Sequence, residues 1–231
     1  MLLLLCAVVA LRVRALAGTA ALLTRTRIDD FAVAPLEVCG VGVYALANTW
    51  GAARDGDATG GRVWPCGLEL APRVAAVAAN RTVLDVGCGC GVVALAAARA
   101  GAERVVAADF NAVPLRLVAA AAEDQGLAVE VESFDVGSAA PLPPADVVAF
   151  ADLTYETALA EAVAARVLEA RARGSRVLCA TNPLRAGAAA FRGALPDLRF
   201  EPVALSRHAA THTDARNWKT RLVQHLDVVP D

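Results

Sequence analysis

Residues 83–91 read VLDVGCGCG, a short apolar run that ends in three alternating glycines, Gly87, Gly89 and Gly91. The apolar run predicts a buried strand. The glycines predict a tight turn that a ligand can approach closely, because they carry no Cβ atom. An Ala-rich helical segment follows, ending near Ala100. The stretch therefore predicts a strand, a ligand-binding turn and a helix in direct succession.

The rest of the chain continues this alternation of short strands and helices. Besides 82–86, strands are expected over 104–108, 127–134, 145–151, 176–181, 200–205 and 221–229. Helices are expected over 68–79, 113–125, 155–173 and 186–195, a strand or hairpin over 31–46, and a loop over 51–61. Apolar strands that alternate with helices pair in parallel, with helices on both faces. We expect an α/β, Rossmann-like fold with a seven-stranded, mostly parallel sheet, and ligands beyond the carboxyl ends of its strands.

Acidic residues stand at the ends of the expected strands. Asp85 directly precedes the glycine turn, and its carboxylate suits a ligand with an ammonium group. Asp109 follows the turn by about 20 residues, the spacing at which an acid accepts hydrogen bonds from ribose hydroxyls. Phe110, next to it, is placed to pack near an adenine. The simpler alternatives are a purely structural turn for the glycines and a helix cap for Asp109.

Other ligand classes fit this pattern less well. A dinucleotide turn prefers G-x-G-x-x-G, but Val92 occupies the last glycine position, and no P-loop Lys-Ser/Thr pair follows. The six cysteines and three histidines lack zinc-site spacing, so no metal site is expected. The formal net charge is −2, and the basic residues are scattered, which does not favour a nucleic-acid partner.

Residues 1–28 are expected to be a targeting or leader segment that precedes a domain over 29–231. The segment is apolar as far as Leu11, which is too short to span a membrane, and it carries four arginines but no acidic residue. This composition is typical of a mitochondrial or plastid transit peptide, although residues 15–17 are similar to a signal-peptidase site. A cytoplasmic protein with an ordinary N-terminal helix, or with a misassigned start, is the alternative.

The run from Asp85 to Gly91 resembles the first cofactor motif of the class I methyltransferases, which use S-adenosylmethionine (SAM). The resemblance implies that SAM is bound by Asp85, Gly87, Cys88, Gly89, Gly91, Asp109, Phe110 and Asn111. It also implies that Phe134 and Asp135, at the end of the third strand, lie near the adenine amine. For Asp135, an ordinary surface position is the alternative.

Further stretches resemble the seven-strand protein-lysine methyltransferases of family 16. Trp64-Pro65 precedes the first helix, and Asp152 and Tyr155 form D-x-x-Y after the fourth strand. Residues 176–185, RVLCATNPLR, are similar to the R-V-L-x-x-D-P-x-R segment of the electron-transfer-flavoprotein β-subunit lysine methyltransferases, with Asn182 in place of the Asp. The resemblance covers residues 60–205.

This resemblance implies a SAM-dependent protein-lysine N-methyltransferase. Asp152 would orient the lysine amine, Tyr155 would shape its pocket, and Trp64 would pack against the cofactor or line the lysine channel. Core packing is the alternative for Trp64, and a helix-start role is the alternative for Tyr155. A small-molecule N- or O-methyltransferase and a non-catalytic scaffold of the same fold are the other hypotheses. The expected partner is a substrate protein, and the chain is expected to be a monomer without a stable membrane span.

Overall fold

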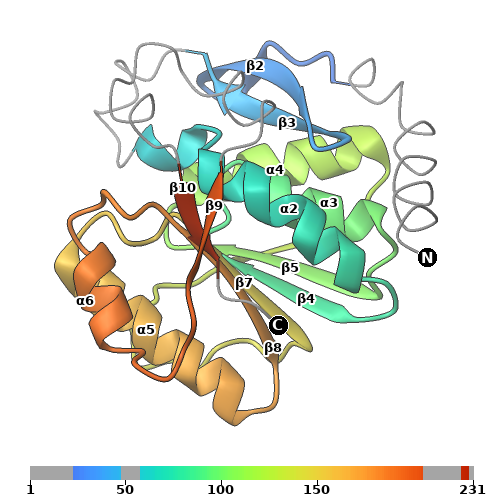
Figure 1. The fold of residues 1–231 in the computed structure, drawn as a ribbon. Helices are drawn as coiled ribbons and strands as arrows, with labels where there is room; N and C mark the ends of the chain where they lie inside the picture. Colours follow the sequence, from blue (N-terminus) through green and yellow to red (C-terminus); the bar gives the residue numbers. More distant parts are fainter. Residues whose placement is uncertain (1–22, 48–57, 205–224, 229–231) are drawn as a thin grey trace.

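The computed structural model describes residues 23–47, 58–204 and 225–228. They form a central sheet covered by helices on both faces, with a small second sheet beside it (Figure 1). Most of the expected leader, residues 1–22, and most of the expected loop over 51–61 lie outside the described residues. The described end of that loop, Ala58–Gly61, is the short 3-10 helix η3.

The central sheet has seven strands in the order β6-β5-β4-β7-β8-β10-β9. They are β4 (Thr82–Val86), β5 (Arg104–Asp109), β6 (Glu130–Ser133), β7 (Val147–Ala151), β8 (Arg176–Thr181), β9 (Glu201–Ala204) and β10 (His225–Val228). β6, β5, β4, β7 and β8 pair in parallel, whereas β10 is antiparallel to both β8 and β9. The expected α/β, Rossmann-like fold is confirmed.

Two helical layers enclose the sheet (Figure 1). α2 (Pro65–Val77), α3 (Val92–Arg99) and α4 (Ala112–Gln125) cover one face, and α5 (Thr157–Ala172) and α6 (Ala188–Gly193) cover the other. Neighbouring residues of a strand point to opposite faces. Val105 accordingly packs in the α2–α4 layer and Val106 in the α5–α6 layer. Both faces of the inner parallel strands β4, β5, β7 and β8 are therefore mostly apolar, as the continuous hydrophobic runs in the sequence predict.

The N-terminal part of the described chain forms the second sheet, from β1 (Arg27–Ile28), β2 (Phe31–Val38) and β3 (Val41–Leu46). β2 and β3 form the antiparallel hairpin expected over 31–46, with a turn at Cys39 and Gly40, whose φ angles are both positive. Leu23 and Ile28 are buried in the core beneath this hairpin. The last residues of the segment assigned to the leader thus pack with the domain.

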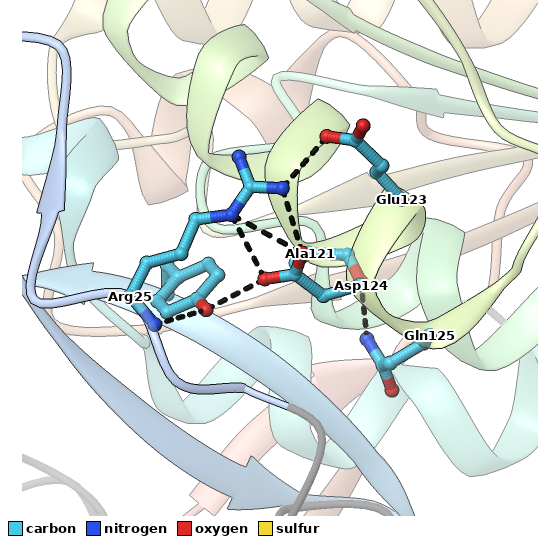
Figure 2. Close-up of polar contacts among 6 residues, drawn as sticks. Arg25, Ala121, Glu123, Asp124 and Gln125 are labelled. Atoms are coloured by element: carbon cyan, nitrogen blue, oxygen red, sulfur yellow. Dashed lines mark hydrogen bonds and ion pairs between the residues drawn. The ribbon is translucent and has the colours of Figure 1, made fainter.

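A group of polar contacts fastens this hairpin to the end of α4 (Figure 2). The Arg25 guanidinium donates to both carboxylate oxygens of Asp124, and the Tyr44 hydroxyl donates to the same carboxylate over 2.7 Å. The Gly42 N–H donates to the Gln125 side-chain oxygen, and the Gln125 amide donates back to the Gly42 carbonyl, each over 2.8 Å. We call these five residues the hairpin clamp.

The third strand differs from its expected range of 127–134. Gly126 ends α4 in a left-handed conformation with φ of 63°, and the Leu127 N–H donates back to the Ala122 carbonyl. The chain therefore becomes extended only at Glu130, and β6 lies at the edge of the sheet with exposed side chains. Among the described residues, no helix has the length and hydropathy that crossing a membrane requires.

Candidate active site

A cavity of about 320 Å³ lies at the carboxyl ends of the central strands. The predicted residues that line it are Trp64, Gly87, Gly89, Asp109, Phe110, Asn111, Phe134, Asp152 and Tyr155. Asp85, Cys88, Gly91 and Asp135 lie outside its lining. In open α/β sheets, ligands bind in the crevice where the strand order reverses, and here β4 lies between β5 and β7 at that place.

The three glycines after β4 all have left-handed backbones, but they serve different purposes. A Cβ atom on Gly87 would lie 2.5 Å from Leu153, and one on Gly91 would lie 2.5 Å from Val118. Both positions exclude side chains because the fold packs against them. A Cβ on Gly89 would meet only the Gly60 carbonyl, at 3.2 Å, and Gly89 lines the cavity. Gly89 is thus the position at which a ligand can approach the backbone.

Asp85 lies behind this turn rather than in it. Its side chain is buried, and Oδ2 accepts a hydrogen bond of 3.0 Å from the Ala94 N–H in the first turn of α3. Burial raises the pKa of the Asp85 carboxyl to about 7, against the effect of the Ala94 hydrogen bond. This carboxyl joins β4 to the start of α3. Its contact with a cofactor ammonium remains a prediction.

Cys88 and Cys90 are buried parts of the same turn. Burial raises the pKa of the Cys88 thiol well above its usual value, and that of Cys90 to about 12. Both side chains therefore remain neutral thiols at physiological pH and contribute to packing. Cys88 belongs to the turn through its backbone, because its N–H donates to the Ala108 carbonyl of β5.

Asp109 connects the end of β5 to the glycine turn. Its Oδ2 accepts from the Gly89 N–H over 3.2 Å, and its Oδ1 accepts from the Asn111 N–H over 2.9 Å. Carboxylate oxygens have lone pairs for more than one hydrogen bond each, so the group can also accept from ligand hydroxyls. The helix cap considered for Asp109 is provided by Asn111, whose Oδ1 accepts from the Val113 N–H.

The aromatic residues near Asp109 give this end of the cavity an apolar wall. The Phe110 side chain is 60% exposed, an unusual position for a large apolar group. Phe134 is buried and lines the same cavity, followed by Val136. Asp135, between them, is exposed and accepts from the Gly137 N–H within a turn. The structure therefore presents Phe134 and Val136 to the cavity and directs Asp135 into the turn.

The opposite end of the cavity contains a buried ion pair that the sequence did not single out. Arg185 donates from Nε to Asp152 Oδ1 over 2.9 Å and from Nη2 to Oδ2 over 2.6 Å. The guanidinium lies over the Trp64 ring, 4.9 Å from its centre. Trp64 itself donates from its indole N–H to the Thr59 carbonyl. Asp152 has a positive φ of 59°, so its carboxylate is held in an uncommon backbone conformation.

Burial and pairing act on both members of the ion pair. Burial raises the pKa of the Asp152 carboxyl, against the lowering effect of the hydrogen bonds and the charge of Arg185. Burial alone would lower the pKa of Arg185, but its hydrogen bonds with Asp152 and the carboxylate charge outweigh that effect and raise it. Arg185 belongs to residues 176–185, the stretch that is similar to a segment of the lysine methyltransferases, but its partner Asp152 lies 33 residues earlier. No local pattern joins the two positions, and only the parallel pairing of β7 with β8 brings them together.

Comparison with known proteins gives the class of this domain. Residues 83–174 match the family model of a methyltransferase domain. A ribosomal protein L11 methyltransferase from Pelotomaculum thermopropionicum is 53% identical over 51 residues, which are 22% of this chain and 17% of the relative. This chain thus spans only a small part of the curated relative that it matches.

Solved structures show the same fold. A Streptococcus mutans protein described as a SAM-dependent methyltransferase is similar with a TM-score of 0.57 and 14% identity, covering 85% of this chain and 54% of that one. The T. thermophilus 16S rRNA N2 G1207 methyltransferase, in complex with AdoMet and guanosine, has a TM-score of 0.55 and 14% identity, covering 87% and 50%. At this identity the likeness shows the fold, and the chain spans about half of each neighbour.

Residues 83–174 therefore match a methyltransferase domain, and the described residues have the fold of SAM-dependent methyltransferases, in agreement with the prediction from the sequence. The resemblance to the protein-lysine methyltransferases of family 16 is a finer statement, and it remains a prediction. The roles of the individual site residues also remain predictions, now with defined positions in the cavity.

Proposed function

We propose that this domain transfers the methyl group of SAM to the side-chain amine of a lysine in a substrate protein. The observation that carries the proposal is that one cavity joins two sets of residues. Gly89 and Asp109 line it from the ends of β4 and β5, and Asp152 and Tyr155 line it from the segment after β7. A cofactor side and an acceptor side therefore meet within one space.

The cofactor side has the chemistry that SAM requires. Asp109 can accept hydrogen bonds from the ribose hydroxyls, the exposed Phe110 ring can stack on the adenine, and Gly89 leaves its backbone open to the ligand. Bound SAM supplies a sulfonium methyl group whose leaving group is a neutral thioether. The protein therefore has to orient the acceptor and keep water away more than it has to move protons.

The acceptor side has groups suited to an amine. A lysine side chain must lose a proton before its nitrogen can attack the methyl group, and its ordinary pKa is about 10.4. Burial lowers that pKa because the charged form loses hydration, so the ammonium group can release the proton to water before the transfer. Asp152 can accept a hydrogen bond from that amine and fix its direction, and Tyr155 lies beside it in the lining. Correct alignment of two reacting groups is worth up to ~7–11 kcal/mol in favourable cases.

The short match to a ribosomal protein L11 methyltransferase supports a protein acceptor, since that relative is named for a protein substrate. A mitochondrial or plastid location is part of the same proposal and rests on the composition of residues 1–28. Fusion of these residues to a fluorescent protein tests it, with a fusion in which the four arginines are replaced by glutamine as the control.

The proposed activity is tested with the purified protein, methyl-labelled SAM and an organelle extract. Label should enter a protein band that resists ribonuclease, and acid hydrolysis of the band should release methylated lysine. Label in RNA, in a small molecule or in another amino acid would contradict the proposed acceptor. Asp109→Ala should abolish labelling because it removes the carboxylate that holds the cofactor.

Asp152→Asn tests the acceptor side separately. We expect SAM affinity within about threefold of the unmodified protein and methyl transfer reduced by about 100-fold, because the amine loses its orienting carboxylate. Calorimetry with SAM and the labelling assay measure the two quantities. Glu156→Gln is the matched control, since Glu156 is exposed and outside the cavity lining. Equal transfer by Asp152→Asn would remove Asp152 from the mechanism.

A further inference from the structure

The ion pair at the acceptor end has the composition of a cation-binding site. The Arg185 guanidinium lies between the Asp152 carboxylate, at 2.6 and 2.9 Å, and the Trp64 ring, at 4.9 Å. A carboxylate and an aromatic face on either side of a positive charge is a common means of recognising cations in proteins. Here the cation is a side chain of the same protein.

The three groups come from three separate elements. Trp64 precedes α2, Asp152 follows β7, and Arg185 follows β8. Trp64 and Asp152 are each fixed by further contacts, since the indole donates to Thr59 and the Asp152 N–H donates to the Ala180 carbonyl. Arg185 lies in the turn between β8 and α6, next to Leu184, which is 65% exposed. The Arg185 side chain is 18% exposed and that of Asp152 is 4% exposed, so Arg185 is the member of the ion pair whose side chain can move into solvent.

While Arg185 is in place, it holds both oxygens of the Asp152 carboxylate and leaves that side chain only 4% exposed, whereas the Arg185 side chain is 18% exposed. Both residues line the cavity, so an ammonium group that enters it competes with the guanidinium for the carboxylate. If one cation replaces the other, neither the carboxylate nor the indole is left without a partner, so the exchange avoids the cost of a lone buried charge.

We propose that Asp152 and Trp64 form the binding site for the acceptor's ammonium group, and that Arg185 occupies this site until the acceptor displaces it. Arg185 is then a specificity-determining residue. Alkylammonium groups can replace it because they pair with Asp152 and stack on Trp64, whereas neutral and anionic compounds would leave the Asp152 carboxylate without a counter-charge. The proposal rests on the proposed function for the identity of the acceptor, but the cation site can be tested without methyl transfer.

The test measures binding of n-butylammonium, an analogue of the lysine side chain, by calorimetry in the presence of SAM. Arg185→Ala empties the site, so we expect it to bind n-butylammonium at least tenfold more tightly than the unmodified protein does. Arg185→Lys should show no such gain, because its own ammonium group refills the site. n-Butanol, which has nearly the same shape without the charge, should not bind measurably to either protein.

A double variant identifies the partner of the probe. In Asp152→Asn with Arg185→Ala, the gain in n-butylammonium affinity should disappear, because the carboxylate is gone. The proposal is overturned if Arg185→Ala binds the probe no more tightly than the unmodified protein, if n-butanol binds equally well, or if the double variant keeps the gain. Arg185→Gln, which keeps hydrogen-bond donors but no charge, replaces Arg185→Ala if the latter does not fold, with the same expected direction.

The outcome separates this proposal from the proposed function. If n-butylammonium binds as expected but no lysine is methylated by the unmodified protein, the cation site stands and the lysine acceptor is wrong. If lysine is methylated but Arg185→Ala gains no affinity for the probe, the function stands and the role of Arg185 is wrong.

Discussion

Asp85, Asp109 and Asp152 lie at or near the carboxyl ends of neighbouring strands, but each has a different partner. Asp85 is buried against the Ala94 N–H, Asp109 accepts from the backbone of the glycine turn, and Asp152 pairs with Arg185. Of the three, only Asp109 and Asp152 line the cavity. The partner, and not the residue type or its place along a strand, determines what each carboxyl contributes.

Asp85 should make the stability of the domain depend on pH. Its pKa is about 7 in the folded protein, against 3.8 for an ordinary aspartate. Between pH 4 and pH 7, the Asp85 carboxyl is therefore protonated in the folded state and ionised in the unfolded state. The contribution of Asp85 to the free energy of unfolding consequently falls as the pH rises from 4 to 7. At 1.36 kcal/mol per unit, the full change is on the order of 4 kcal/mol.

Asp85→Asn, which is neutral at every pH, isolates this effect. Urea unfolding at pH 4.5, 5.5 and 6.5 should show the variant gaining stability relative to the unmodified protein as pH rises. A difference that stays constant over this range would mean that Asp85 is already ionised when folded.

Gly89 should be required for cofactor binding and not only for folding. Gly89→Ala places a methyl group in the cavity at a residue with φ of 50°. Gly174→Ala is the control, because Gly174 has a similar φ of 80° but lies outside the cavity lining, and a Cβ there would have no atom within 4 Å. Both variants should lose roughly 1 kcal/mol of stability from the left-handed backbone. Only Gly89→Ala should also weaken SAM binding, by tenfold or more in calorimetry. Equal SAM affinity in the two variants would place the cofactor away from Gly89.

The sequence indicated most of these residues but not their roles. Glycines and acids at the ends of apolar strands are visible as a local pattern, so Gly89, Asp109 and Asp152 could be predicted. Whether a side chain enters the cavity depends on the direction of its Cα–Cβ bond and on its hydrogen-bond partner, as Asp135 and Asp85 show. Arg185 was missed because its partner is distant in sequence and is brought near only by strand pairing.

At the scale of elements, the β2–β3 hairpin packs against α4, which covers one face of the central sheet. The hairpin clamp provides polar contacts between the two, and Figure 2 shows those of Arg25 and Asp124. The chain that leaves β3 continues to η3, where Thr59 and Gly60 line the cavity. The hairpin therefore supports one wall of the site, although it is outside the central sheet.

Gln125→Ala should loosen the hairpin without unfolding the sheet. The variant leaves the Gly42 N–H and carbonyl without their partner, which costs about 1–3 kcal/mol for buried groups. Hydrogen exchange read by mass spectrometry should become about tenfold faster in β2 and β3 and remain unchanged in β4 and β7. Glu123→Gln is the control, because the Glu123 side chain is 74% exposed and its ion pair with Arg25 should contribute little. Faster exchange throughout the sheet would show that hairpin and sheet open together.

The existence of the elements was easier to predict than their ends. The boundaries of β4 and β8 follow from apolar runs enclosed by polar residues and match the expected ranges. The start of β6 could not be predicted, since Leu127 and Val129 suit a strand by composition. The left-handed Gly126 and the hydrogen bond from Leu127 to Ala122 instead form the C-terminal cap of α4.

At the scale of the whole molecule, the cavity brings together residues from separate parts of the described chain. Its lining comes from η3, from the start of α2 and from the ends of several strands. A ligand that contacts all of these at once holds them together. The bound protein should therefore be more stable as a unit than any single contact suggests.

SAM should accordingly raise the melting temperature of the protein. At a ligand concentration of 100 times Kd, binding adds about 2.7 kcal/mol to the stability. For a domain of this size that is roughly 5–10 °C in a thermal melt. Asp109→Ala should show no such increase, and ATP, which lacks the sulfonium and the amino acid, should not replace SAM. An unchanged melting temperature at saturating SAM would contradict the assignment of the cavity.

Trp64 and Arg185 both lie outside residues 83–174, the stretch that matches the methyltransferase-domain family. The glycine turn and Asp109 lie within it. Asp152 and Tyr155 also lie within it, so the part of the acceptor end that is encoded outside this stretch is Trp64 and Arg185. After a gene duplication, descendants can acquire new substrates through changes in two short peripheral segments, while the inherited middle of the chain keeps the same methyl donor.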